Sequence, residues 1–387
     1  MTFASHALAA GAVAARTGDA HALGQALQGV RARTQGLMAA WARSMPELTV
    51  PYAPELNPPL WELGHIGWFQ DWWIARNRER PLGHQCAPAH ARAVSRLSEA
   101  DSWYNSSQVP HASRWHLRLP DLAQTWDYVQ AVQADTLALL AGAGEDDDGL
   151  YFWRLVLLHE AMHNEASVYM AQALGVAMPD ALAQRCSHSA TPAAVLHVPA
   201  QTWLLGATGP GFAFDNELGP HPVTMAAFEI DACPVSWARY LPFIDATGRA
   251  LPPHVRCLDG QWQQQRFGHW GALVWDGPAV HLNVDDAEDW CYWAGRRLPT
   301  EAEWECAALT QNGFAWGQVW EWTASAFEAY PGFAAHPYED YSAPWFGARR
   351  VLRGACAATD VTMVHPRYRN FFTPERRDIF AGFRSAM

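Results

Sequence analysis

Hydrophobic residues in the first half of the chain recur at the spacing of a helix. Apolar side chains return every three or four positions between Leu27 and Met38, which is typical of a helix that buries one face. The same pattern predicts further helices over three segments: 60–77, 121–140 and 151–174. Gly175 is placed to end the last of them. Four helices joined by loops predict an antiparallel bundle, whose interior is a common place for a metal site.

The pattern changes after residues 176–194, which have the composition of a linker. Short apolar runs such as Val195 to Val198 and Thr202 to Gly206 alternate with turns rich in glycine and proline, which predicts short strands. Helical spacing returns in three short segments: 235–247, 284–294 and the stretch after Pro299, where Thr300 and Glu303 are spaced as a capping box. The second half is therefore predicted to be a loop-rich α+β domain.

Composition excludes several classes of function. The length of 387 residues suggests two domains, and half of the residues are hydrophobic, so a large core is available. The net charge is −12 and the basic residues form no stripe, which argues against a nucleic-acid partner. All 27 basic residues are arginine. Without lysine the chain can form neither a Schiff base nor a P-loop.

Cysteine usage and hydropathy predict a cytoplasmic protein. Seven cysteines are scattered without a C-x-x-C pair, which is typical of reduced thiols. The alanine-rich start lacks the basic region of a signal peptide. No apolar run approaches the ~18 residues of a membrane span, so no membrane partner is expected.

Two histidines four residues apart are the strongest chemical signal in the sequence. On a helix, His159 and His163 lie on one face about one turn apart, where both imidazoles can bind one metal ion. Glu165 points away from that face and is expected to support the site from outside the ligand set. His65 lies far upstream, and if it completes the site, coordination positions stay open. An open site predicts an enzyme rather than a structural metal module.

Several segments in a fixed order resemble one known family, the ergothioneine-type sulfoxide synthases. The first half is similar to their DinB-like four-helix domain, and the second half to their formylglycine-generating-enzyme-like (sulfatase-modifying-factor) domain, an α+β fold of the C-type-lectin-like kind. The matching segments are 64–69, 159–165, 212–217, 293–305, 319–323, 350–354 and 369–384. The resemblance implies a multidomain α and α+β protein, with domains at residues 1–180 and 190–387.

The resemblance also implies a reaction. In that family a mononuclear non-haem iron(II) binds three histidines, activates O2 and joins a thiol to the imidazole of hercynine, which is Nα-trimethylhistidine. Carried over to this chain, the ligands are His65, His159 and His163. Three neutral imidazoles leave positions for O2, the chalcogen and the substrate imidazole.

Family resemblance suggests further site residues. Asn164, Asn370 and Phe371 fall where the family recognises hercynine, because amide oxygens and an aromatic face suit a quaternary ammonium. Phe371 could equally be ordinary packing. Tyr104, in a long connection between two predicted helices, and Tyr341 are candidate proton donors, with Tyr338 as a rival.

One loop departs from the pattern. Members that use γ-glutamylcysteine carry an arginine-rich loop and an Asp after the C-terminal aromatic residue, whereas here the loop 105–115 carries Arg114 as its single arginine and Phe372 replaces the Asp. Arginine clusters bind carboxylates, so their loss predicts a neutral, hydroxyl-rich donor such as a sugar. This points to the selenoneine synthase branch, which joins a selenosugar to hercynine. Arg114 and Phe372 become candidate substrate contacts.

Other functions remain open at this point. A thiol such as cysteine could replace the selenosugar as donor. A DinB-type thiol transferase would use zinc without O2, and a binding module would bind hercynine without turnover. Cys356 stands alone in its segment, which argues against copper chemistry and sulfatase activation. The expected partners are small-molecule substrates, and the chain is expected to be a monomer or weak homodimer.

Overall fold

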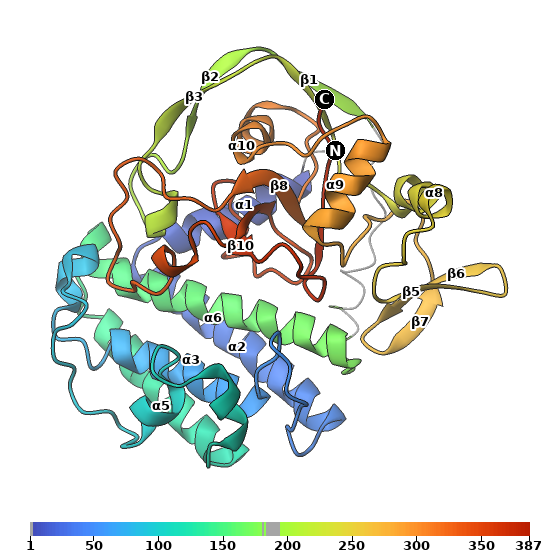
Figure 1. Ribbon diagram of the computed structural model, residues 1–387. Coiled ribbons are helices and arrows are strands. Elements are labelled where there is room, and N and C mark those ends of the chain that lie inside the picture. The colour runs from blue at the N-terminus through green and yellow to red at the C-terminus, as the bar shows by residue number, and fades with distance from the viewer. Residues whose placement is uncertain (1–2, 180–181, 183–193) are drawn as a thin grey trace.

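Helices fill the first half of the chain, as the hydrophobic spacing predicts. The computed structural model describes residues 3–179, 182 and 194–387. Its helices in this half are α1 (Phe3–Thr17), α2 (Ala20–Ser44), α3 (Pro59–Trp73), α4 (Ala100–Tyr104), α5 (Leu122–Leu140) and α6 (Asp147–Leu174). The four long helices α2, α3, α5 and α6 pack against one another (Figure 1). No helix in the described ranges has the length and apolar character needed to span a membrane.

Helix α6 is the central element of the molecule. It begins after Asp146, whose side chain accepts a hydrogen bond from the backbone N–H of Gly149, and it ends at Gly175 in the left-handed conformation, with φ of 68°. Gly175 is thus the cap that the sequence predicts. In Figure 1 the helix runs between the other long helices and the strands of the second half. Side chains are therefore buried on several of its faces.

Helix α3 is buried on nearly every side, and at one position another residue approaches its backbone closely. Pro59 occupies its first turn, where a missing N–H costs nothing. A Cβ built on Gly64 would lie 2.2 Å from two ring carbons of Tyr104, so only glycine fits there. The close approach places Tyr104 directly beside the turn that carries His65.

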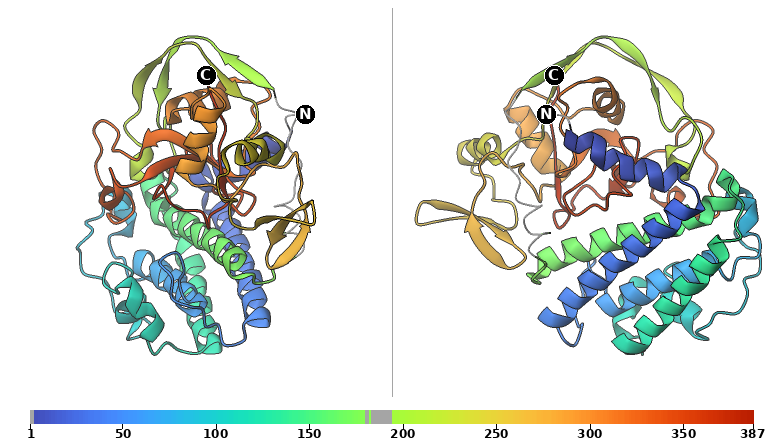
Figure 2. Two further views of the ribbon diagram at one scale, coloured as in Figure 1. Left: turned by 45° about the vertical axis from the view of Figure 1, so that its right-hand side comes forward. Right: turned by 180° about the vertical axis from the view of Figure 1, so that it is seen from behind.

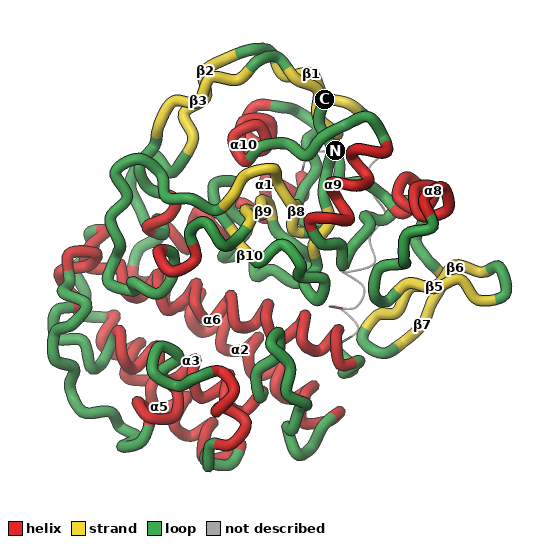
Figure 3. The backbone as a smooth tube through the Cα atoms, in the orientation of Figure 1, coloured by secondary structure: helices red, strands yellow, loops and turns green. Residues whose placement is uncertain are grey.

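Small sheets and loops form the second half. The strands are β1 (Val195–Val198), β2 (Gln201–Leu205), β3 (His221–Met225), β4 (Phe228–Asp231), β5 (Val255–Leu258), β6 (Gln261–Arg266), β7 (His269–Ala272), β8 (Trp320–Ala326), β9 (Arg350–Gly354), β10 (Asn370–Phe372) and β11 (Ala381–Gly382). The largest sheet has the order β10-β9-β8-β11, in which only the β11–β8 pair is parallel. Loops connect most of these elements (Figure 3).

The helices of the second half lie where the sequence predicts them. They are α8 (Trp237–Thr247), α9 (Val284–Trp293) and α10 (Glu301–Thr310). The capping box of α10 is present, since Thr300 accepts from the Glu303 backbone N–H and the Glu303 side chain accepts from Thr300. Most of the predicted linker 176–194 lies outside the described residues, so the boundary between residues 180 and 190 stays a prediction.

Polar contacts join the two halves along one seam. Arg16 of α1 makes a buried ion pair with Glu217 at 2.9 Å, and α1 lies against the second half when the molecule is seen from behind (Figure 2). Gln172 near the end of α6 accepts a hydrogen bond from the Phe267 backbone N–H at 2.7 Å. The side chains at this seam are therefore held by both halves of the chain.

Two arginines of the second half form ion pairs with glutamates of the same half. Arg384 donates to Glu321 at 2.7 Å, and both side chains are fully buried. Arg297 pairs with Glu303 at 2.7 Å. The Arg384 pair follows the rule that a buried charge needs a partner, whereas Arg297 is partly exposed.

Candidate metal centre

Three histidines converge at the centre of the molecule. His65 comes from α3, and His159 and His163 come from consecutive turns of α6. One ring nitrogen of each lies within 4.8 Å of the other two, and the Nε2 atoms of His159 and His163 are 3.1 Å apart. The structure thus brings together the three residues that the sequence singles out, with donor atoms close enough to share one ion.

Each imidazole is oriented by a neighbour. His65 Nδ1 donates to the carbonyl oxygen of Tyr104 at 2.7 Å, which leaves its Nε2 free to accept a metal. His163 Nδ1 lies 2.5 Å from Glu62 Oε2. His159 is held by the ring of Phe69, which stacks on it with centroids 3.5 Å apart. Partners of this kind fix the tautomer and the ring orientation of metal-binding histidines.

Burial keeps two of the histidines, His65 and His159, in the form that a metal requires. Burial, assisted by the charge of His163, lowers the pKa of His65 to about 3. Burial also places the pKa of His159 well below its ordinary value. Neutral imidazoles have a lone pair available for coordination. Among the described residues no fourth histidine, cysteine or carboxylate joins the group, so the donor set fits a metal with open positions.

A second cluster of possible ligands is less suited to a cation. Glu79, Cys86 and His90 also bring donor atoms within 4.8 Å of one another. The Arg92 guanidinium, however, lies 2.5 Å from both ring nitrogens of His90. A fixed positive charge at that distance repels a divalent ion.

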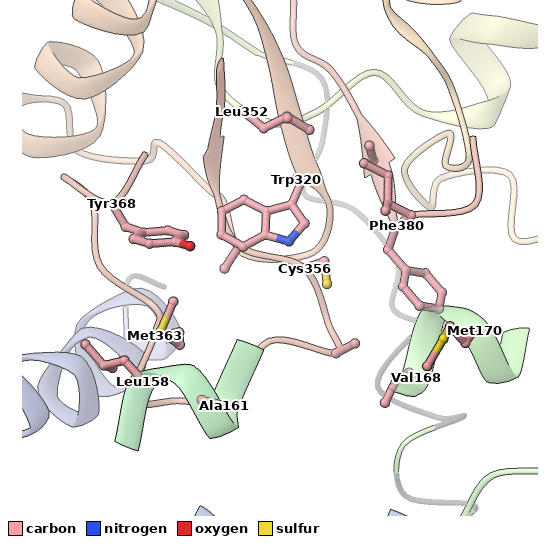
Figure 4. Packing of buried hydrophobic residues seen from close by; sticks show 14 of the residues in the cluster. Leu158, Ala161, Val168, Met170, Trp320, Leu352, Cys356, Met363, Tyr368 and Phe380 are labelled. Atoms are coloured by element: carbon pink, nitrogen blue, oxygen red, sulfur yellow. The ribbon is translucent and has the colours of Figure 1, made fainter. Parts of the chain in front are cut away.

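A cavity of about 200 Å3 opens beside His163. We call it the Glu165 cavity, because Glu165 is its one carboxylate among the described residues. Both halves of the chain form its walls, which also include Met162, Ala166, Tyr169, Trp320, Met363, Tyr368, Asn370 and Phe372. Figure 4 shows Trp320, Tyr368 and Met363 above the turn of α6 that carries Ala161.

The Glu165 carboxylate is held in place from the second half. Trp320 Nε1 donates to one oxygen at 2.6 Å, and Thr359 Oγ1 donates to the other at 2.5 Å. Burial raises the pKa of Glu165. A cation in the cavity would favour the ionised form, because opposite charges stabilise each other most strongly where water is excluded.

A second cavity, of about 150 Å3, lies beside Phe69, the residue that stacks on His159. We call it the Asn105 cavity. Its walls are aromatic on one side and polar on the other, and include Trp68, Phe69, Trp72, Trp73, Asn105, Ser106, Ser107, Tyr338, Glu339 and Asp340. Phe69 separates it from His159, and the ring of Tyr338 packs edge-on against Phe69 with centroids 4.9 Å apart.

The predicted substrate residues are divided between this region and the core. Asn370 and Phe372 line the Glu165 cavity. Asn164 is buried on the opposite side of α6, where its Nδ2 donates to the Val30 carbonyl of α2 at 3.2 Å. Phe371 stacks on Phe327 with centroids 4.0 Å apart, in a separate cluster of buried aromatic residues. The structure therefore does not bring Asn164 or Phe371 to either cavity.

The candidate tyrosines also differ in position. The Tyr104 ring packs against Gly64, while its carbonyl orients His65. The Tyr341 hydroxyl lies 3.0 Å from the Tyr368 hydroxyl, and both hydroxyls contact the sulfur of Met162, one residue before His163. The Tyr341–Tyr368 pair is thus the pair of phenols beside the Glu165 cavity.

Arg114 contacts a tryptophan that stacks on one of the three histidines. Its guanidinium lies 3.9 Å from the Trp61 ring centroid, and Trp61 stacks on His65 with centroids 4.8 Å apart. Arg114 Nη1 donates to Asn57 Oδ1 at 2.9 Å. The arginine is therefore engaged inside the protein, although the sequence alone suggested a substrate contact.

Sequence reasoning missed three residues of the site. Glu62 lies three residues before His65, and its place one helical turn away was a usable signal. Tyr368 carries no such signal. Trp320 is both buried and part of the cavity wall.

Comparisons with known proteins support this picture. Residues 181–318 and 313–387 match the family described as the sulfatase-modifying factor enzyme 1-like domain. The formylglycine-generating enzyme of Streptomyces coelicolor is 27% identical, over 49% of this chain and 88% of that enzyme.

Two relatives match nearly the full length. The hercynine oxygenase of Mycolicibacterium smegmatis is 30% identical, covering 88% of this chain and 93% of that protein. The hercynine oxygenase of Mycolicibacterium thermoresistibile is 31% identical, covering 88% of this chain and 89% of that protein. The chain therefore belongs to the hercynine oxygenase family, the ergothioneine-type sulfoxide synthases that its motifs resemble.

Proposed function

We propose that this protein is a non-haem iron(II), O2-dependent enzyme that couples a selenosugar to the imidazole of hercynine, forming a C–Se bond. The observation that carries the proposal is the group of three imidazoles, with the Glu165 cavity beside His163 and the Asn105 cavity behind Phe69, the residue that stacks on His159. Iron bound by His65, His159 and His163 would supply the activation of O2.

The Glu165 cavity suits hercynine. A quaternary ammonium cannot donate hydrogen bonds and is stabilised by aromatic faces and by negative charge. The cavity offers Tyr169, Trp320, Tyr368 and Phe372 as aromatic walls and Glu165 as the negative group. Because His163 also lines the cavity, a ligand whose ammonium lies near Glu165 can direct its imidazole toward the metal.

The Asn105 cavity suits a neutral, hydroxyl-rich donor. None of the residues that line it in the described part of the chain is basic, and Arg114 is engaged with Asn57 and Trp61. Asn105, Ser106 and Ser107 can exchange hydrogen bonds with hydroxyl groups, and Glu339 and Asp340 can accept them. Glu339 and Asp340 would repel a donor that carries two carboxylates.

The side chains around the centre position the reactants and control protons. Phe69 covers one face of the His159 ring and excludes water from it. The Tyr341–Tyr368 pair, held 3.0 Å apart, is placed to deliver a proton beside His163. Burial raises the pKa of both phenols, so both are protonated at neutral pH.

A direct competition between donors tests this proposal. The iron(II) enzyme is mixed with hercynine and O2 and with either 1-seleno-N-acetylglucosamine or cysteine, and products are identified by mass spectrometry. We expect a selenium adduct of hercynine from the selenosugar. Turnover with cysteine alone would exclude the selenosugar and favour the second candidate, a sulfoxide synthase that uses a thiol.

Metal and oxygen dependence test the enzyme class. After the metal is removed by a chelator, iron(II) but not zinc is expected to restore activity, and only in the presence of O2. Full activity with zinc under argon would indicate a DinB-type thiol transferase. Hercynine binding without turnover under every condition would indicate a binding module.

A further inference from the structure

Two tryptophans of helix α3 stack on His65. The ring centroids of Trp61 and His65 are 4.8 Å apart, with an angle of 9° between the ring planes. The centroids of Trp68 and His65 are 5.7 Å apart, with an angle of 24°. Both indoles are buried. Because indole is among the most easily oxidised side chains and stacked rings exchange electrons readily, each of the two tryptophans is placed to reduce an oxidant at the histidines.

The neighbours of Trp61 make it hard to oxidise. The Arg114 guanidinium lies 3.9 Å from the Trp61 ring centroid, and Trp61 Nε1 donates to the carbonyl oxygen of Trp103 at 2.7 Å. A cation over an indole stabilises the neutral ring and repels the positive charge that the loss of an electron creates. A peptide carbonyl accepts a hydrogen bond but does not take up the proton.

The neighbours of Trp68 make it easier to oxidise. Trp68 Nε1 donates to Asp101 Oδ1 at 2.7 Å. Two hydrogen bonds of 2.7 Å from Arg76 hold the same carboxylate and lower the pKa of Asp101, so the carboxylate is ionised at neutral pH. A carboxylate stabilises positive charge on the indole and can take up its Nε1 proton. Trp68 can therefore lose an electron and a proton together.

Arginines also oppose oxidation of the next tryptophan on the helix. The Trp72 ring lies 5.4 Å from the Trp68 ring, centroid to centroid, and the guanidinium groups of Arg76 and Arg92 lie 4.9 and 5.0 Å from the Trp72 centroid. Over the Trp68 ring, by contrast, no guanidinium lies in the described part of the chain. Trp68 also lines the Asn105 cavity. A radical on Trp68 is therefore accessible to a reductant in that cavity.

We propose that Trp68, with Asp101 as its proton acceptor, is an internal reductant that gives up one electron when O2 reacts at the three histidines without a selenium or sulfur donor in place. This inference rests on the proposed function, which supplies O2 as the oxidant. The electron passes to O2 and the Nε1 proton to Asp101, which leaves a neutral indolyl radical. The half-exposed Asp101 then releases its proton to solvent.

A thiol or selenol that enters the Asn105 cavity restores the indole. It gives Trp68 one hydrogen atom, and two of the resulting sulfur or selenium radicals join as a disulfide or diselenide. The histidines then escape oxidation. Without such a reductant, the indolyl radical reacts with O2, and oxygen is added to the ring. Added oxygen on Trp68 is therefore a permanent record of the electron transfer.

Mass spectrometry of the digested protein tests the proposal. The iron(II) protein is exposed to O2 without hercynine, thiol or selenol, and fragment ions locate the added oxygen. A second arm uses hydrogen peroxide under argon, because peroxide oxidises bound iron(II) whatever the natural reaction, and zinc-loaded protein gives the background. We expect about ten times more oxygen on Trp68 than on Trp61, although Trp61 lies nearer to His65.

Matched variants change the neighbours of each tryptophan. Asp101→Asn keeps a hydrogen-bond acceptor for the indole but removes its proton acceptor, and is expected to lower the oxidation of Trp68 about tenfold. Arg114→Gln is expected to raise the oxidation of Trp61 and to leave that of Trp68 unchanged. Trp68→Phe is expected to move oxidation onto the histidines and to shorten the time for which the protein retains iron under O2. Circular dichroism and metal content check that each variant is folded and loaded.

Four results would overturn the inference. They are equal oxidation of Trp61 and Trp68, unchanged oxidation of Trp68 in Asp101→Asn, equal oxidation of Trp68 in the zinc-loaded protein, and no oxidation of Trp68 in either arm with iron bound. Failure of the proposed function looks different. If peroxide oxidises Trp68 selectively and O2 does not, Trp68 is the internal reductant of the centre, but the enzyme does not use O2.

Discussion

The Glu62 carboxylate lies 2.5 Å from His163 Nδ1, and opposing effects decide its charge. Burial alone would raise its pKa, but the charge and hydrogen bond of His163 lower it below the ordinary value. An ionised carboxylate makes the opposite ring nitrogen of His163 a better metal donor.

Replacing Glu62 with glutamine is therefore expected to weaken iron(II) binding by about 10- to 100-fold, as measured by metal titration of the apoprotein. The control is Glu79→Gln, which changes the other cluster of possible ligands. If Glu79→Gln lowers the metal content and Glu62→Gln does not, the metal binds the cluster of Glu79, Cys86 and His90, and our assignment is wrong.

The tyrosines give a second prediction at this scale. Tyr341→Phe removes a hydroxyl beside Met162 and is expected to lower kcat by about 10²- to 10⁴-fold with little change in hercynine affinity. Tyr104→Phe is expected to keep kcat within about twofold, because the Tyr104 ring packs against Gly64 and its carbonyl still orients His65. Steady-state kinetics on both variants decide between them, and the reverse ranking would return the catalytic role to Tyr104.

Single residues also show where sequence reasoning reaches its limit. The i, i+4 spacing of His159 and His163 was enough to predict one shared face. Asn164 and Glu165 follow directly, and the same helical geometry turns them toward other surroundings. Asn164 meets α2, and Glu165 meets Trp320 of the second half. Because α6 is buried on several faces, periodicity could not tell which of them lines a cavity.

At the scale of elements, helix α3 depends on one glycine. A Cβ at Gly64 would lie 2.2 Å from the Tyr104 ring, whereas at Gly36 of α2 it would meet nothing within 4 Å. Gly64→Ala is expected to lower the free energy of unfolding by about 1–3 kcal/mol through overpacking. Gly36→Ala is expected to raise it by about 0.5–1 kcal/mol, because alanine favours the helix.

Urea unfolding followed by circular dichroism measures both changes. Iron(II) titration of Gly64→Ala adds a second readout, since displacement of Tyr104 also displaces the carbonyl that orients His65. A Gly64→Ala protein with wild-type stability and metal affinity would mean that the close packing of α3 and Tyr104 is not needed.

Elements with a strong local signal were predicted well. Val195–Val198 is a strand with the predicted bounds, and the capping box at Thr300 begins α10. Helix α1 was not predicted, although its sequence is rich in alanine, the strongest helix former. Strand β11 has two residues and exists only through pairing with β8, so no local pattern could reveal it.

At the scale of the whole molecule, buried histidines make stability depend on pH. Burial, together with His254, lowers the pKa of His281 to about 3, while an unfolded histidine titrates near 6.5. Between these values only the unfolded chain takes up the proton. The free energy of unfolding therefore falls as the pH falls below about 6.5, by about 1.4 kcal/mol per pH unit for this residue.

His281→Asn is expected to remove that slope, and asparagine tolerates the left-handed backbone of this position, where φ is 63°. Urea unfolding at pH 7 and pH 5 measures the effect, which is about 2 kcal/mol less acid destabilisation in the variant. His116→Asn, at an exposed position, is the control. Equal slopes in wild type and His281→Asn would mean that His281 takes up its proton in the folded state.

The interface between the two halves of the chain was the least predictable feature. The motifs revealed both halves and their family, but not which surfaces face each other. Ion pairs such as Arg16–Glu217 join residues about 200 positions apart, and no spacing rule links them. The cavities arise at this seam, so their walls were predicted only in part.

Helix α6 carries two of the three proposed metal ligands, His159 and His163, together with one wall of the Glu165 cavity, whereas Trp320, Tyr368 and Phe372 reach that cavity from the other half. The distance between the proposed metal site and Glu165 is therefore set by the geometry of one helix, and it does not depend on how the two halves of the chain pack together. Heating that separates the two halves would remove Trp320, Tyr368 and Phe372 from the cavity, while the three histidines would stay together in the first half. We expect heated enzyme to release its organic ligand at a lower temperature than its iron.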